Sequence, residues 1–170
     1  MKKYHLKDLK YGTPAVAEIE LTYSCNIHPQ DRRRAYNSEE LAQLLYEWWN
    51  AESIELRETV AVLFLDRANG VIGIYEHSRG GTTATTVDPK LIMAAALKSR
   101  AECIVIAHNH PSGQLWPSQG DIDLTKRLAT AGKLLGIPVL DHLLVTPYGG
   151  YYSFAYSRPD VLAGYRLDFM

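Results

Sequence analysis

The chain has 170 residues, 46% of them hydrophobic and 22% charged, which suits one ordinary globular domain with its own core. Its formal net charge of -1 excludes a general electrostatic attraction to nucleic acid or anionic membranes, although not a local basic patch. Two cysteines without a paired motif, the lack of a signal-peptide pattern and the lack of a membrane-length apolar run predict a cytoplasmic protein.

Residues 1–37 are predicted to form a polar leader and one edge strand. Between Ala15 and Ser24, apolar and polar residues alternate with the period of a half-buried strand. A short basic run, Arg32, Arg33 and Arg34, follows. Such a run is usually solvated surface, and contact with nucleic acid is the alternative interpretation.

A helix is predicted over 39–51, with Ser38 as its N-cap in a capping box. Leucines and Trp48 recur at helical spacing behind this cap, so the helix has one packed face. The pattern places Trp48 in the core. Trp49 points elsewhere and is expected to cover another element or a partner.

From residue 58 to 156 the chain alternates strands and helices, with a hairpin at each end. Strands are predicted over 58–66, 71–77, 101–107, 137–145 and 151–155, and helices over 89–100 and 118–136. This order predicts a single-domain layered α/β fold with a central mixed sheet flanked by helices. We expect the domain to extend over 38–156, with a peripheral C-terminal tail over 157–170.

The candidate chemistry lies where the buried strand 101–107 ends. His108 and His110 are two residues apart, so both imidazoles project from one face and can converge. Asn109 faces the opposite side and is expected to hold the strand end by hydrogen bonds. Asp121 lies in the first turn of the next helix, where Ser118-x-x-Asp121 also fits an ordinary capping box. Two imidazoles and a carboxylate would hold one Zn²⁺ and leave a position open for water, as in catalytic zinc sites.

These residues carry a resemblance to a known family. His-x-His-Pro at 108–111 followed by Ser118-x-x-Asp121 resembles the metal signature of JAMM (MPN) metalloprotease-like domains. HNHPSG, PSQGD, the SRG at 78–80, and LLGIPVLDHLLV followed by YYSF resemble the bacterial RadC branch of that family, over about 55–155. The resemblance implies the JAMM fold, which is cytidine-deaminase-like. Members of the branch usually carry a helical DNA-binding-type segment ahead of this domain, and we expect this chain to correspond to the catalytic-type domain alone.

The resemblance also implies a glutamate at the start of a strand, which acts through the metal-bound water. Glu58 matches this position, and Glu52, Glu55 and Glu76 are the alternatives. Glu58 would take the proton of the attacking water and pass it to the leaving amine. The Ser118 hydroxyl would help to stabilise the oxyanion, with simple N-capping as the alternative role.

Other residues are expected around the site. The pair Asp141-His142 resembles an Asp-His pair of the RadC branch and would orient a ligand, line the cleft or serve only the structure. Trp116 would meet substrate or plug its loop. Arg79 would line the cleft or bind an anionic group. His5, His28 and His77 are expected on the surface.

Together these features predict a zinc-dependent hydrolase of peptide or isopeptide bonds, acting on an unidentified peptide or protein. The alternatives are a RadC-type DNA-repair or mobile-element-associated protein acting on or with DNA, and a non-catalytic interaction module. The near-neutral charge counts against the first, and the full set of ligands and base against the second. A zinc deaminase is excluded, because its H-x-E and P-C-x-x-C elements are absent. No membrane partner is expected, and no pattern indicates an oligomeric state.

Overall fold

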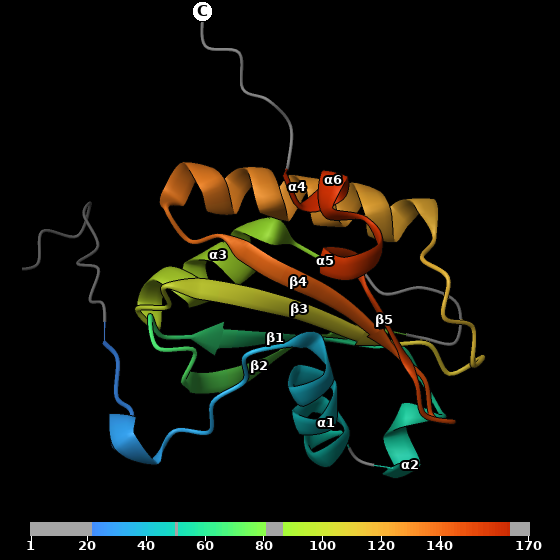
Figure 1. Cartoon of the computed structure of the whole chain (residues 1–170), viewed down its shortest axis with the longest axis horizontal. Helices are drawn as coiled ribbons and strands as arrows, with labels where there is room; N and C mark the ends of the chain where they lie inside the picture. Colours follow the sequence, from blue (N-terminus) through green and yellow to red (C-terminus); the bar gives the residue numbers. More distant parts are fainter. Residues whose placement is uncertain (1–21, 50, 81–86, 164–170) are drawn as a thin grey trace, which may run out of the picture.

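A five-stranded sheet forms the centre of the molecule. The computed structural model describes residues 22–49, 51–80 and 87–163. The sheet order is β2-β1-β3-β4-β5, and its strands are Thr59–Leu65 (β1), Val71–Arg79 (β2), Cys103–Asn109 (β3), Val139–Val145 (β4) and Tyr151–Ser153 (β5). Strands β3 and β4 run parallel, whereas the other neighbouring pairs are antiparallel. The predicted α/β fold with a mixed sheet is confirmed (Figure 1).

Helices cover both faces of this sheet (Figure 1). Helices α1 (Ser38–Trp48) and α2 (Ala51–Ile54) lie on one face, and α3 (Pro89–Lys98) and α4 (Gln119–Leu135) on the other. Two short helices, α5 (Phe154–Ser157) and α6 (Pro159–Leu162), follow β5, and a 3₁₀ turn, η2, spans Pro29–Asp31. Because side chains alternate along a strand, β1 and β3 send apolar residues into both layers and are buried throughout.

Only part of the predicted N-terminal edge strand, over 15–24, lies within the described residues. Most of the expected edge strand, residues 15–21, and His5 lie outside the described residues. Residues 22–24 are described and form no strand, so the prediction is wrong for that part.

The arginine run lies against the domain. Arg32 forms an ion pair of 2.8 Å with Asp66, and Arg33 is paired with Glu47. Arg34 forms a main-chain bridge to the turn that precedes β2. Two of the three cations are therefore already neutralised by acidic side chains of the same chain.

Helix α1 begins one residue earlier than predicted. Asn37, and not Ser38, is its N-cap and accepts a hydrogen bond from the Glu40 amide. The helix ends at Trp48, and Trp49 leaves it with an extended backbone. This change of direction turns Trp49 into the core at 6% exposure, whereas Trp48 is only partly buried, the reverse of the prediction.

Other boundaries also differ from prediction, among them the ends of β3, β4 and β5. Strand β2 continues to Arg79, because Ser78 and Arg79 still pair with the start of β1. The expected tail from residue 157 begins inside the fold, since Val161 of α6 is fully buried against Leu144 and Phe154. A single turn of four residues is too short to show helical periodicity in the sequence.

Candidate metal centre

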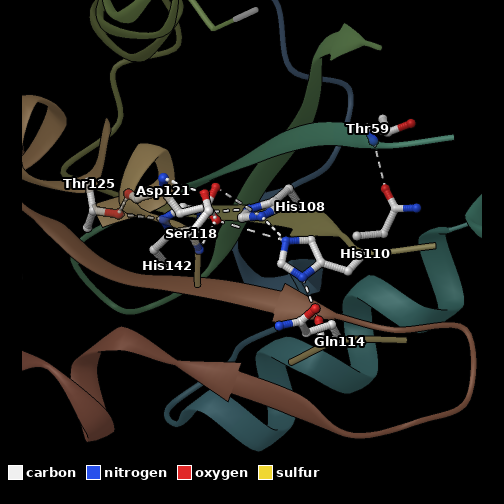
Figure 2. Close-up of polar contacts among 9 residues, drawn as sticks. Thr59, His108, His110, Gln114, Ser118, Asp121, Thr125 and His142 are labelled. Atoms are coloured by element: carbon white, nitrogen blue, oxygen red, sulfur yellow. Dashed lines mark hydrogen bonds and ion pairs between the residues drawn. The ribbon is translucent and has the colours of Figure 1, made fainter. Parts of the chain in front are cut away.

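Three side chains meet where the end of β3 faces the start of α4 (Figure 2). The Nε2 atoms of His108 and His110 lie 2.8 Å apart. One carboxylate oxygen of Asp121 is 3.3 Å from His108 Nε2, and the other is 4.0 Å from His110 Nε2. All three donor atoms fall within 4.8 Å of one another, so the group could hold a metal ion. The convergence predicted from the His-x-His spacing is present.

The protonation of His110 follows from its other ring nitrogen. His110 Nδ1 lies 2.5 Å from the carbonyl oxygen of Gln114. A carbonyl only accepts hydrogen bonds, so Nδ1 carries the hydrogen. In the neutral ring, Nε2 then presents a lone pair toward His108 and Asp121.

A hydrogen-bonded chain assigns the His108 ring in the same way. The Thr125 hydroxyl donates its single proton to the Asp121 carbonyl over 2.6 Å, so it accepts from His142 Nδ1, also at 2.6 Å. His142 Nε2 is left as an acceptor for His108 Nδ1 at 2.9 Å. Burial lowers the pKa of both His142 and His108, which keeps the two rings neutral. His108 Nε2 therefore also presents a lone pair.

Two ring lone pairs and a carboxylate thus point toward one another. None of these atoms carries a hydrogen, so they cannot form hydrogen bonds among themselves. Zn²⁺ with ligands at about 2.0–2.1 Å would put tetrahedral donor atoms about 3.3 Å apart. The separation of the two Nε2 atoms, 2.8 Å, and that of His108 Nε2 from Asp121 Oδ1, 3.3 Å, lie around that value. The donor set fits a cation of this kind.

Asp121 serves the helix end at the same time. Its Oδ2 accepts from both the amide and the hydroxyl of Ser118 at 2.7 Å, while the Asp121 amide donates to Ser118 Oγ. The capping box predicted for α4 is present. The cap occupies Oδ2 and leaves Oδ1 toward His108, so the capping role is compatible with a role of Asp121 as a metal ligand, which stays a prediction. The Ser118 hydroxyl orients Asp121 in this arrangement, and its oxyanion role stays a prediction.

Glu58 lies immediately before β1 and lines one cleft with His110 and Ser118. The side chain is half-buried. Burial raises the pKa of its carboxyl, with smaller opposing influences of His110, which lowers it, and Asp121, which raises it. Of the alternative glutamates, Glu76 is paired with Arg79 and Glu55 is exposed outside this cleft. The side chain of Glu52 lies outside the described part of the chain.

Asn109 ties the strand end to the segment that carries Glu58. Its Oδ1 accepts from the Thr59 amide at 2.7 Å, and its Nδ2 donates to the carbonyls of Ile54 and Arg57 at 2.7 and 2.9 Å. The hydrogen bonds expected for Asn109 are present. They hold the residues on both sides of Glu58.

The pair Asp141-His142 divides between the two faces of the sheet. His142 contacts His108 and so orients a candidate ligand, as one interpretation of the pair predicts. Asp141 faces α1 instead and accepts from the hydroxyls of Ser38 and Ser153 at 2.7 Å each. Asp141 therefore lies away from the metal centre.

Two predicted locations are corrected. Arg79 does not line the Glu58 cleft: it is paired with Glu76 and lines a separate cavity of about 320 Å³. His77 is not a surface residue, since its Nε2 accepts from the Asp88 amide at 3.0 Å and its ring is partly buried. Both belong to β2: Arg79 is the last residue that pairs with β1, and His77 lies at the irregularity in that pairing. His28 is exposed, as expected.

Two contacts of the site were not predicted. Thr125 completes the chain to His142, and the Gln114 carbonyl orients His110. Thr125 stands four residues after Asp121 on one helix, a spacing that could have suggested it. A main-chain carbonyl leaves no mark in the sequence.

A family profile and several individual relatives indicate the same protein family. The sequence profile of the RadC-like JAB domain matches residues 35–158. A UPF0758 protein of Flavobacterium johnsoniae is 45% identical over 93 residues, 55% of this chain and 40% of that protein. UPF0758 proteins of Porphyromonas gingivalis (43% over 99 residues) and Thermosynechococcus vestitus (47% over 102 residues) are similar. These matches take in 58% and 60% of this chain and 44% and 40% of the two proteins. The chain thus matches less than half the length of these relatives.

Proposed function

Because this chain belongs to the RadC-like JAB domain family, we propose that it is a zinc-dependent hydrolase of amide bonds in peptides or proteins. One Zn²⁺ per chain would be held by His108, His110 and Asp121. The observation that carries the proposal is the pair of ring lone pairs and the carboxylate converging beside Glu58, a carboxyl with a raised pKa. A perturbed acid in a cleft beside metal-binding donors is typical of hydrolytic sites.

The side chains divide the work of such a reaction. A zinc ion bound here would supply an activated water at neutral pH. His108 and His110 keep their Nε2 lone pairs directed at the site, because His142 and the Gln114 carbonyl hold their Nδ1 hydrogens. Glu58 removes a proton from the attacking water and delivers it to the leaving amine nitrogen. Its raised pKa makes the carboxylate a stronger base, which favours the first of these transfers.

The structure offers less support for action on DNA. Arg32 and Arg33 are engaged by acidic partners. Among the described residues that line the Glu58 cleft, none is lysine or arginine, which phosphate contacts would use.

We also propose that the protein is cytoplasmic. Both cysteines, Cys25 and Cys103, are free thiols, which suits the predicted reducing cytoplasm. Among the described helices, none has the length and apolar character to cross a membrane.

Metal analysis tests the zinc assignment. Purified wild-type protein is expected to hold about one zinc per chain, and His108→Ala and Asp121→Ala to lose most of it. His28→Ala removes an exposed imidazole elsewhere and serves as the matched control, with zinc unchanged. Zinc that persists at full stoichiometry in both ligand variants would sink the assignment.

Glu58→Gln tests the chemistry separately. With a peptide library as substrate, we expect zinc to be retained and hydrolysis to fall by about 10² to 10⁴-fold, the usual contribution of a general base. Full hydrolysis by Glu58→Gln would show that another group is the base.

A further inference from the structure

Two large apolar side chains stand exposed on the cleft that holds Glu58 and His110. Trp116 is 72% exposed and Leu56 is 66% exposed. Both line this cavity of about 340 Å³, together with Pro111 and Pro117. Single exposed apolar residues are common on protein surfaces, so exposure alone does not indicate a binding site. These two residues differ because both line one cleft, beside the proposed base.

Trp116 sits on a loop that the rest of the protein holds in place. The loop begins at His110, whose ring bonds the Gln114 carbonyl, and it ends at the capping box of Ser118. At its turn, Gly113 has a φ of +81° and lies against the Tyr148 ring, where an added Cβ would come within 2.9 Å of ring carbons. These contacts fix the conformation of the loop and hold Trp116 in its exposed position.

The back of the Trp116 ring rests on an aromatic series that reaches the metal centre. Trp116 packs edge-to-face on Tyr152 with ring centroids 6.3 Å apart, and Tyr152 contacts Phe154 at 5.3 Å. Phe154 in turn stacks on His142, the partner of His108, at 5.1 Å. One side of the Trp116 ring is thus supported, while the residue stays 72% exposed and lines the cleft. This arrangement does not fill a void in the loop, so the plugging role considered for Trp116 does not apply.

The charges around the cleft restrict what these walls can contact. Glu58 lines it, and the Asp121 carboxylate lies next to it. The described lining residues include no lysine or arginine to balance an anionic group. An acidic side chain or a phosphate would therefore find no cationic partner on these walls, whereas an apolar side chain would remove water from both walls.

We propose that Trp116 and Leu56 form a subsite for a bulky apolar side chain of the substrate, next to the amide bond that is cut. The inference rests on the proposed function and names its substrate class, a peptide segment with a leucine-like residue at the scissile bond. Partial burial of such a side chain between two walls gives about a tenfold preference over glycine.

Zinc-binding hydroxamates test this subsite without any turnover. The probes are the hydroxamates of acetyl-leucine, acetyl-glycine and acetyl-glutamate, titrated calorimetrically into zinc-loaded wild-type protein. We expect the leucine probe to bind about tenfold more tightly than the glycine probe, and the glutamate probe no more tightly than glycine. Trp116→Ala and Leu56→Ala should each reduce the leucine preference to about threefold or less, with the glycine probe unaffected.

Two further variants guard against indirect effects. Trp116→Phe keeps an aromatic wall and should retain most of the preference. Tyr156→Ala removes an exposed aromatic ring that lines a different cavity, and should leave the preference unchanged. An unchanged leucine preference in both alanine variants, or a glutamate probe that binds as tightly as leucine, overturns the proposal.

The outcome also separates this inference from the proposed function. A leucine preference that depends on Trp116, in a protein that hydrolyses no peptide, would retain the subsite and reject the hydrolase. Hydrolysis that depends on Glu58 but ignores the neighbouring side chain would retain the hydrolase and reject the subsite.

Discussion

At the ends of β3 and β4, both faces of the sheet carry buried polar residues, but their hydrogen bonding differs. On the face toward α4, His108 and His142 form a chain that ends in an unprotonated nitrogen facing His110 and Asp121. On the face toward α1, every polar atom of Asn109 and Asp141 finds a partner inside the protein. All four residues are almost completely buried.

Burial therefore does not distinguish the face with the candidate site from the face without it. The difference is whether a chain of hydrogen bonds closes within the protein or ends at lone pairs that face one another. A closed network stabilises the fold, since its groups have lost water and depend on each other. An open network leaves its last atoms oriented as donors that a metal ion could use.

The largest effect is expected on the closed face, for Asp141→Ala. This change leaves Ser38, Ser153 and two main-chain amides without their buried acceptor, and should lower the free energy of unfolding by about 3–5 kcal/mol. Urea denaturation of the metal-free protein measures the loss. Zinc stoichiometry should survive. A variant that lost zinc while keeping its stability would contradict the division between the faces.

Asn109→Ala should cost less stability, about 2–3 kcal/mol, but should also slow hydrolysis. It removes three hydrogen bonds that hold the backbone on both sides of Glu58. Denaturation and kcat at full zinc occupancy report the two effects. Asn37→Ala is the matched control, because it removes the α1 cap at about 1 kcal/mol and should leave kcat alone. Equal effects of both variants on kcat would argue against a specific link between Asn109 and Glu58.

On the open face, His142→Phe should weaken zinc binding by about 10 to 100-fold, because the buried Nδ1 hydrogen of His108 loses its acceptor. His142→Gln can still offer an acceptor oxygen and should lose less. Competition with a zinc chelator measures both affinities. If the phenylalanine variant bound zinc as tightly as wild type, the ring of His142 would not orient the site.

The smallest effect concerns His77, a partly buried neutral ring outside both networks. Burial lowers the pKa of His77, and its Nε2 accepts from the Asp88 amide at the α3 cap. As pH falls below about 6.5, the unfolded chain takes up this proton before the folded one, so stability is lost on acidification. Urea denaturation at about pH 7.5 and 5.5 should show a smaller decline for His77→Gln than for wild type. Zinc should not alter that difference, unlike the pH response of His108.

Contacts between residues close in the sequence could be predicted, whereas contacts between distant residues could not. The convergence of His108 and His110 and the cap of Ser118 and Asp121 depend on neighbours two or three residues apart, and both were predicted. The contact of His108 with His142 spans 34 residues, and that of Ser38 with Asp141 spans 103. Neither could be read from local periodicity. Ser38 was accordingly misassigned as a cap, although its hydroxyl belongs to the closed network.

The sequence by itself determined the alternation of strands and helices, the family, and the order of the candidate ligands along the chain. These follow from hydrophobic period and from motifs a few residues long, which local backbone geometry converts directly into position. Only the tertiary structure decided which face each residue of Asp141-His142 serves, which ring nitrogens carry hydrogen, and that Trp116 stands open to the cleft. Those outcomes depend on the pairing of β3 with β4 and on the packing of Trp116 against β5, because partners distant in sequence fix the hydrogen bonds and the exposure.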